Sequence, residues 1–204
     1  LNFVKNNLMK KMLGCVLAFF TYFTGISQVN QYNGGLKRND IAPDFTLTGT
    51  DDKKYQLQEL LKKGPVVLVF YRGQWCPYCN KTLSNLTDSL SFIVSRGAMV
   101  MAVSPETPAN LLKTISKTKS TFPILSDSGM LVMKAYKVQF EVDESTIKKY
   151  KGYGIDFNVA NGSNGANLPV PATYVIGQNG MIRYAFYDTD YRQRATVKNI
   201  LAHL

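Results

Sequence analysis

Cysteine and histidine are scarce in this chain, and their scarcity limits its chemistry. The 204 residues include three cysteines and one histidine, His203, which is next to the last residue. A structural zinc site needs about four such ligands, so we expect neither a bound metal nor another cofactor. A cysteine–histidine hydrolase is also disfavoured, because we expect His203 to lie at the surface near the terminus.

The chain also has little that could cross a membrane. A spanning helix needs about 20 apolar residues, whereas the apolar run near the N-terminus covers residues 12–23. Three lysines precede this run and the small residues Gly25 and Ser27 follow it, which is the order of a secretory signal peptide. We predict a signal peptide over residues 1–27 and an extracytoplasmic location, periplasmic or secreted, for the mature chain. An uncleaved anchor is the alternative, and it would be the only contact with a membrane.

Basic residues exceed acidic ones, yet they form no pattern typical of nucleic-acid binding. The formal charge is +10, and it falls to +7 without the leader, which carries three lysines and no acidic residue. The remaining lysines form short clusters without interleaved aromatic residues, at 53–54, 62–63 and 148–151. We therefore expect a solvated basic surface and no nucleic-acid partner. Loss of the leader also removes Cys15, so Cys76 and Cys79 become the only thiols.

The most informative feature is the sequence Cys76-Pro77-Tyr78-Cys79. An apolar run over 65–71 precedes it and predicts a buried strand, and an amphipathic stretch over 80–96 predicts a helix. A Cys-x-x-Cys pair at a strand-to-helix junction indicates redox chemistry. The free N–H groups and the positive dipole end of the first helical turn stabilise a thiolate and lower its pKa. A purely structural disulfide is a weaker explanation, because its very short loop adds little stability.

Strands and helices alternate along the rest of the chain, which predicts an α/β domain with a mainly parallel sheet. We expect a flexible leader over 28–40 and a single domain over 41–204. Residues 141–169 are rich in Lys, Tyr, Gly and Asn, and they fit either an insertion or lid beside the site or a plain surface loop. Hairpins are expected across 49–52 and across the Asn-Gly turn at 177–180. Further strands are expected at 98–103 and 122–125, and helices at 108–117, with Thr107 as cap, 129–136 and 194–204.

Four motifs in order resemble the peroxiredoxin-like branch of the thioredoxin superfamily, the alkyl hydroperoxide reductase/thiol-specific antioxidant family. They are Ala-Pro-Asp-Phe at 42–45, the segment 70–79, Phe-Pro-Ile-Leu-Ser-Asp at 122–127 and Val-Pro-Ala-Thr-Tyr-Val-Ile at 170–176. The resemblance covers residues 40–190. It implies a thioredoxin-like fold, with a central mixed sheet flanked by helices. It also implies reduction of peroxides or disulfides, with a thioredoxin-type or other dithiol reductant as partner.

The chain departs from the family pattern at two positions. The register of Phe70 and Tyr71 puts Cys79 at the peroxidatic cysteine, and Cys76 at the position where the family has Thr or Ser. The arginine that polarises the peroxide should come two residues before Thr173, where this chain has Pro171. Both replacements are typical of thioredoxins, in which such a proline follows a cis peptide bond and faces the disulfide. An ordinary edge-strand proline is the alternative.

These departures leave two mechanisms open for the same pair. In a thioredoxin-like reaction Cys76, expected to be the more exposed, attacks and Cys79 resolves. In a peroxiredoxin-like reaction Cys79 becomes a sulfenic acid, which Cys76 resolves. Arg72 is the only nearby candidate to replace the missing arginine, and Trp75 is expected to pack beside the site, with Tyr78 between the cysteines. The hypotheses are therefore a peroxiredoxin-like peroxidase, a thiol-disulfide reductase or isomerase, and a non-catalytic binding module of the same fold.

Overall fold

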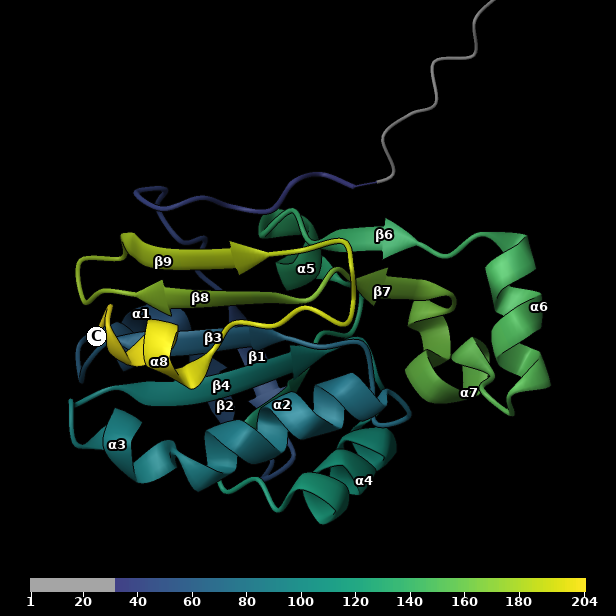
Figure 1. Cartoon of the computed structure of the whole chain (residues 1–204), viewed down its shortest axis with the longest axis horizontal. Coiled ribbons are helices and arrows are strands. Elements are labelled where there is room, and N and C mark those ends of the chain that lie inside the picture. Colours follow the sequence, from purple (N-terminus) through teal and green to yellow (C-terminus); the bar gives the residue numbers. More distant parts are fainter. Residues whose placement is uncertain (1–31) are drawn as a thin grey trace, which may run out of the picture.

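A computed structural model of the chain describes residues 32–204. Figure 1 shows a central sheet with helices on both faces, as the mixed α/β class requires. The strands of this sheet are β1 (Thr46–Gly49), β2 (Lys54–Gln56), β3 (Val66–Phe70), β4 (Met99–Ser104), β5 (Ile124–Ser126), β8 (Ala172–Ile176) and β9 (Ile182–Tyr187). The expected hairpins form as β1–β2 and β8–β9, and each expected strand is present with its ends within two residues of the expected positions.

The sheet is mixed, with the strand order β2-β1-β5-β4-β3-β8-β9. Only the neighbours β3–β4 and β4–β5 run parallel, while the other four pairs of neighbours are antiparallel. The expectation of a mainly parallel sheet is therefore wrong. The two hairpins add antiparallel strands at both edges, and helical connections between parallel neighbours occur only among β3, β4 and β5.

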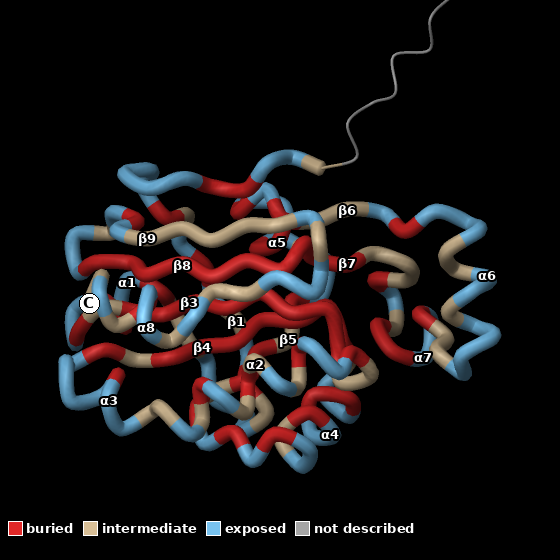
Figure 2. Tube along the Cα trace, in the orientation of Figure 1, coloured by how far each residue is buried: buried red, intermediate tan, exposed pale blue. Residues whose placement is uncertain are grey.

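Strand β3 lies at the centre of the sheet, and all five of its residues are buried. Its alternate side chains enter two cores, one on each face of the sheet. Val66, Leu68 and Phe70 pack with the residues around α1 (Leu57–Leu61) and α5 (Leu131–Ala135). Val67 and Val69 pack under the helices of the other face, in the core that also contains both cysteines. Figure 2 shows the central strands as the buried layer of the molecule.

The helices of the second face are α2 (Pro77–Asp88), α3 (Leu90–Val94), α4 (Pro108–Thr118) and α8 (Val197–Leu201). The single helix expected over 80–96 is thus two helices that start three residues earlier and break at Ser89, where φ is −102° and ψ is 5°. The early start has a local cause, because Pro77 occupies the first helical position and Cys76 is the N-cap. Thr107 precedes α4 as expected, although its hydroxyl makes no capping bond.

Residues 141–169 are an ordered insertion rather than a plain loop. The insertion contains α6 (Glu144–Gly152), α7 (Phe157–Asn161) and a short 3-10 helix, Gly162–Asn164. Strands β6 (Gln139–Glu141) and β7 (Asn167–Pro169) pair at its base. These elements stand together at one end of the molecule, beyond the main sheet (Figure 1). A small core of its own, around Val142, Phe157 and Leu168, holds the insertion together.

The segment before the domain packs on it over residues 35–40, although the sequence predicts a flexible leader over 28–40. Leu36 is buried, and its N–H donates to the hydroxyl of Tyr174. The N–H of Asn39 donates to the carbonyl of Ile182 on the edge strand β9. The predicted signal peptide lies outside the described residues. Between residues 32 and 204, no helix is both long and apolar enough to cross a membrane.

Candidate active site

The two cysteines meet at the N-terminus of α2, on the face of the sheet that the helix covers. The Cys76 sulfur is the cap of the helix and accepts a hydrogen bond from the N–H of Cys79, with 3.4 Å between N and Sγ. Both thiols are free in this structure, and both residues have no exposed surface. The expectation that Cys76 is the more exposed of the two is therefore wrong. Exposed surface does not distinguish the thiols, but their surroundings do, because burial has the largest effect on the pKa of Cys79 and hydrogen bonding has the largest effect on the pKa of Cys76.

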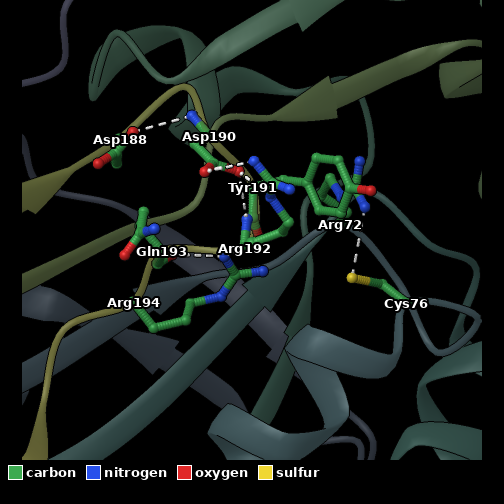
Figure 3. A network of polar contacts seen from close by, with 8 residues as sticks. All are labelled: Arg72, Cys76, Asp188, Asp190, Tyr191, Arg192, Gln193 and Arg194. Carbon is green, nitrogen blue, oxygen red and sulfur yellow. Dashed lines mark hydrogen bonds and ion pairs between the residues drawn. The ribbon is translucent and has the colours of Figure 1, made fainter.

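Cys76 is the activated thiol of the pair. Its pKa is lowered to about 5, chiefly because the Cys79 side chain donates a hydrogen bond to its sulfur. The Arg72 guanidinium adds its charge and a hydrogen bond of 3.5 Å from Nη2 to Sγ, against the opposing effect of burial. An N-cap thiolate beside a cation is the usual setting of a reactive cysteine. Figure 3 shows Arg72 directed at the Cys76 sulfur.

Cys79 is the thiol that stays protonated. Burial raises its pKa well above the ordinary value, and the neighbouring Cys76 raises it further. The one opposing side chain is Arg194, whose Nη2 lies 3.4 Å from the Cys79 sulfur. The sequence predicted Arg72 as the only arginine near the site and did not single out Arg194. Each sulfur thus has its own guanidinium, and the two arginines are far apart in the sequence.

Arg194 belongs to a loop that follows β9 and covers the site. This loop, residues 188–194, is held by an ion pair of 2.8 Å between Arg192 and Asp190 and by bonds from the Arg194 guanidinium to the carbonyls of Tyr191 and Gln193.

The loop contacts the site through an aromatic ring. The Tyr191 ring lies against Arg72, with 4.0 Å from the guanidinium carbon to the ring centroid (Figure 3). Tyr78, 41% exposed, packs its ring edge against Tyr191. The loop thus holds Arg72 from above while α2 holds Cys76 from below.

The remaining residues that the sequence singled out lie around this centre. Trp75 packs on Tyr150 and Phe157 of the insertion, as expected for a residue beside the site. Thr173 is buried on β8 opposite Val69. His203, partly buried, stacks on Tyr184 near the C-terminus and contributes nothing to the site. Between residues 32 and 204, no group of His, Cys, Asp and Glu side chains could hold a metal ion.

Pro171 precedes β8, whose first residue pairs with Phe70 at the end of β3. Pro171 therefore lies beside the start of the loop that joins β3 to α2, residues 71–76, which we call the redox loop. The expected cis bond is absent: every peptide bond from residue 32 onward is trans, including Val170–Pro171. This outcome agrees with the general preference of X-Pro bonds, of which only about 5–6% are cis in folded proteins.

A buried acid that the sequence analysis missed, Glu106, lies under the redox loop. It has no exposed surface, and burial raises its pKa to about 8. One carboxylate oxygen accepts from the N–H of Gln74 at 2.8 Å, and the other has no hydrogen-bond partner within the described part of the chain. Gly73 passes so close that a Cβ there would lie 2.8 Å from Glu106 Oε1. The signal was present in the sequence, because Glu106 follows β4 and the ends of the parallel strands β3 and β4 meet at one edge.

Comparison with known proteins places the chain in a family. A family model described as the AhpC/TSA family matches residues 39–185. Peroxiredoxin Q of Oryza sativa subsp. japonica is 28% identical over 153 residues, which are 75% of this chain and 60% of that protein. The chain spans less than two thirds of the length of the first curated relatives that it matches.

Solved structures of other proteins share the fold of this chain. Peroxidoxin BcpB of Mycobacterium tuberculosis superposes with a TM-score of 0.64 at 21% identity, over 82% of this chain and 96% of that one. Peroxiredoxin Q of Xanthomonas campestris superposes with a TM-score of 0.57 at 16% identity, over 78% and 85%. The expected thioredoxin-like, peroxiredoxin-type fold is therefore confirmed. Because the family model covers well over half of the sequence, the chain belongs to the AhpC/TSA family.

Proposed function

We propose that this protein is a thiol peroxidase that reduces hydrogen peroxide or organic hydroperoxides through the pair Cys76 and Cys79. The observation that carries the proposal is the unequal pair itself: one sulfur is an N-cap thiolate beside Arg72, and the other is a buried thiol one helical turn away. Membership of the AhpC/TSA family supports peroxide as the substrate class.

In the first step the Cys76 thiolate attacks one oxygen of the peroxide. The O–O bond breaks, Cys76 becomes a sulfenic acid, and the departing alkoxide or hydroxide takes a proton and leaves as an alcohol or as water. Negative charge shifts to the leaving oxygen as this bond breaks, and a fixed cation lowers the barrier. Arg72 is the cation in contact with the attacking sulfur, so we assign this role to it.

In the second step Cys79 attacks the Cys76 sulfenic acid. The S–O bond breaks, water leaves, and the two sulfurs form a disulfide. The nucleophile is the Cys79 thiolate, and the Arg194 guanidinium favours it against the burial that otherwise keeps the thiol protonated. A thioredoxin-type dithiol then reduces the disulfide by thiol–disulfide exchange and is itself oxidised. We expect the reduction potential of the pair between about −270 and −200 mV, the range of thioredoxins and glutaredoxins.

The order of attack is the reverse of the order that the family register implies. That register places the peroxidatic cysteine at Cys79, whereas the electrostatics favour Cys76. The same electrostatics also fit a thiol-disulfide reductase or isomerase, which is the second candidate function, because such enzymes attack with the N-terminal cysteine of the pair. A non-catalytic module of this fold would need neither sulfur, so it alone predicts that replacing both cysteines by serine leaves function unchanged.

The experiment that separates these functions uses the chain's single tryptophan, Trp75, as reporter of the neighbouring Cys76. Reduced protein is mixed with hydrogen peroxide, fluorescence is followed, and sulfenic acid is trapped with dimedone in the Cys79→Ser and Cys76→Ser variants. We expect dimedone on Cys76 in Cys79→Ser and little reaction in Cys76→Ser. Dimedone on Cys79 in Cys76→Ser would restore the family register. If neither variant reacts with peroxide while Cys79→Ser traps mixed disulfides with a protein substrate, the protein is a disulfide exchanger.

We further propose that the mature chain acts outside the cytoplasm. The support is the lysine-flanked apolar run over residues 12–23. This location also bears on the donor, because a dithiol reductant would have to be supplied in that compartment.

A further inference from the structure

The insertion makes a hydrogen bond to the active site through one hydroxyl group. Tyr150, on α6, accepts a hydrogen bond from Nη1 of Arg72 at 3.1 Å. The other terminal nitrogen of the same guanidinium, Nη2, donates to the Cys76 sulfur. A single planar group therefore joins the insertion to the reactive thiol. Because the guanidinium is rigid, a partner that fixes one of its nitrogens also fixes the direction of the other.

Few other polar contacts hold Arg72 in place. The residue is 6% exposed, and its Nε has no hydrogen-bond partner among residues 32–204. Its remaining neighbours are ring faces, at 4.0 Å for Tyr191, 5.2 Å for Trp75 and 6.0 Å for Tyr150. Cation–π contacts favour a guanidinium near a ring but leave it free to turn in the ring plane. The hydroxyl of Tyr150 is the contact that sets its direction.

Tyr150 is itself held at a fixed position. Its ring packs edge-on against Trp75, at 5.3 Å between centroids, and against Phe157 at 5.4 Å. Phe157 is buried in the small core of the insertion, while Trp75 belongs to the redox loop. These three rings join the insertion to the loop whether or not the hydroxyl is present. Removal of the hydroxyl alone therefore changes the bond to Arg72 and leaves the packing.

We propose that Tyr150 is a positioning residue that holds the Arg72 guanidinium against Cys76, so that the insertion sets the reactivity of the redox pair. The inference rests on the proposed role of Cys76 as the reactive thiolate and names what controls it. Without the hydroxyl, the guanidinium can turn between the rings of Tyr191 and Trp75. Its hydrogen bond to the sulfur then weakens, and the thiolate loses part of its stabilisation. The effect on the sulfur is indirect, since the hydrogen bond and ring contacts described for the Tyr150 side chain are with Arg72, Trp75 and Phe157.

Several other ionisable groups face the two sulfurs, and the test has to leave them unchanged. Besides each other and Arg72, Cys76 interacts with Glu106 and Cys79 interacts with Arg194 and Tyr71, while Lys113 and Lys117 act on Glu106. Replacing Tyr150 by phenylalanine alters none of them. Tyr153 provides a matched control, because it lies at the C-terminal end of the same helix, is 69% exposed and has no described contact with Arg72.

The test is the pH dependence of iodoacetamide alkylation of Cys76 in the reduced full chain, read by mass spectrometry. We expect Tyr150→Phe to raise the midpoint by about 0.5 unit or more, a threefold or larger loss of thiolate at low pH. Tyr153→Phe should leave the midpoint unchanged. Trp75 fluorescence should match the wild type in both variants, which verifies that the ring packing is retained.

A double-mutant cycle then tests whether Tyr150 acts through Arg72. In an Arg72→Met background, Tyr150→Phe should add no further shift. An equal shift in both backgrounds would overturn the inference, as would a Tyr150→Phe midpoint equal to that of the wild type. If the wild-type midpoint itself lies near the ordinary cysteine value of about 8.5, the proposed function fails together with the inference. A low wild-type midpoint that Tyr150→Phe does not move refutes the inference alone.

Discussion

Replacing Arg72 by methionine should uncouple the Cys76 thiolate from its cation while keeping most of the packing. Arg72 is buried between Tyr191 and the sulfur, and a methionine, which is shorter but unbranched and flexible, replaces its aliphatic stem without charge. The hydrogen bond from Cys79, which is the largest cause of the lowered pKa of Cys76, remains in the variant. The pKa should therefore rise without reaching the value of a free cysteine.

The size of the effect follows from the geometry. An opposite charge within 4–6 Å typically shifts a pKa by about 1–3 units, so a wild-type pKa of about 5 should become about 6–8. For a variant pKa of about 7, the thiolate fraction at pH 5.5 falls from roughly three quarters to roughly 3%, about 25-fold. At pH 8 both proteins are almost fully thiolate. The difference in thiolate fraction is therefore large at pH 5.5 and small at pH 8.

The assay is the ultraviolet absorbance of the thiolate across pH, supported by alkylation rates at pH 5.5 and pH 8. A thiolate of higher pKa is the better nucleophile, with a Brønsted coefficient of about 0.4–0.5. The variant should thus be alkylated more slowly than the wild type at pH 5.5 and faster at pH 8. Arg96→Met removes an exposed arginine remote from the pair and serves as control. A variant whose midpoint equals that of the control would refute the electrostatic account of Cys76.

Three further predictions address other parts of the molecule. Glu106→Gln should raise the melting temperature more at pH 8 than at pH 5. Burial raises the pKa of the folded carboxyl to about 8, so it keeps a proton that the unfolded chain loses above its ordinary pKa of 4.5. Wild-type stability therefore falls as pH rises between these two values. Parallel pH dependences of the melting temperatures of the two proteins would count against this prediction. Arg194→Met should slow disulfide closure by about tenfold, because it removes one charge-assisted hydrogen bond to Cys79, and it should leave the rate of the peroxide step unchanged. The two rates are read from the two phases of the Trp75 fluorescence change. Cell fractionation should find the mature chain in soluble extracytoplasmic extracts with an N-terminus near Gln28, whereas full-length protein in the membrane pellet would favour an uncleaved anchor.

Local sequence determined the strand, the redox pair and the helix that follows it. The apolar run before Cys76 forms β3, and Pro77 with the capping Cys76 starts α2, because each of these signals acts between residues a few positions apart. The hairpins at Gly49–Asp52 and Gly177–Gly180 were likewise predictable from their turn residues. The same is true of the family, whose motifs are short and ordered along the chain.

Only the tertiary structure decided which thiol is activated and by what. Arg72 is four residues from Cys76 and was visible in the sequence, but the hydroxyl that directs it belongs to Tyr150, 78 residues away. Arg194 reaches Cys79 across 115 positions. No local pattern encodes such contacts, because they depend on how the insertion and the C-terminal loop fold back over one edge of the sheet. Burial of both sulfurs was decided in the same way, by packing that propensity and spacing do not contain.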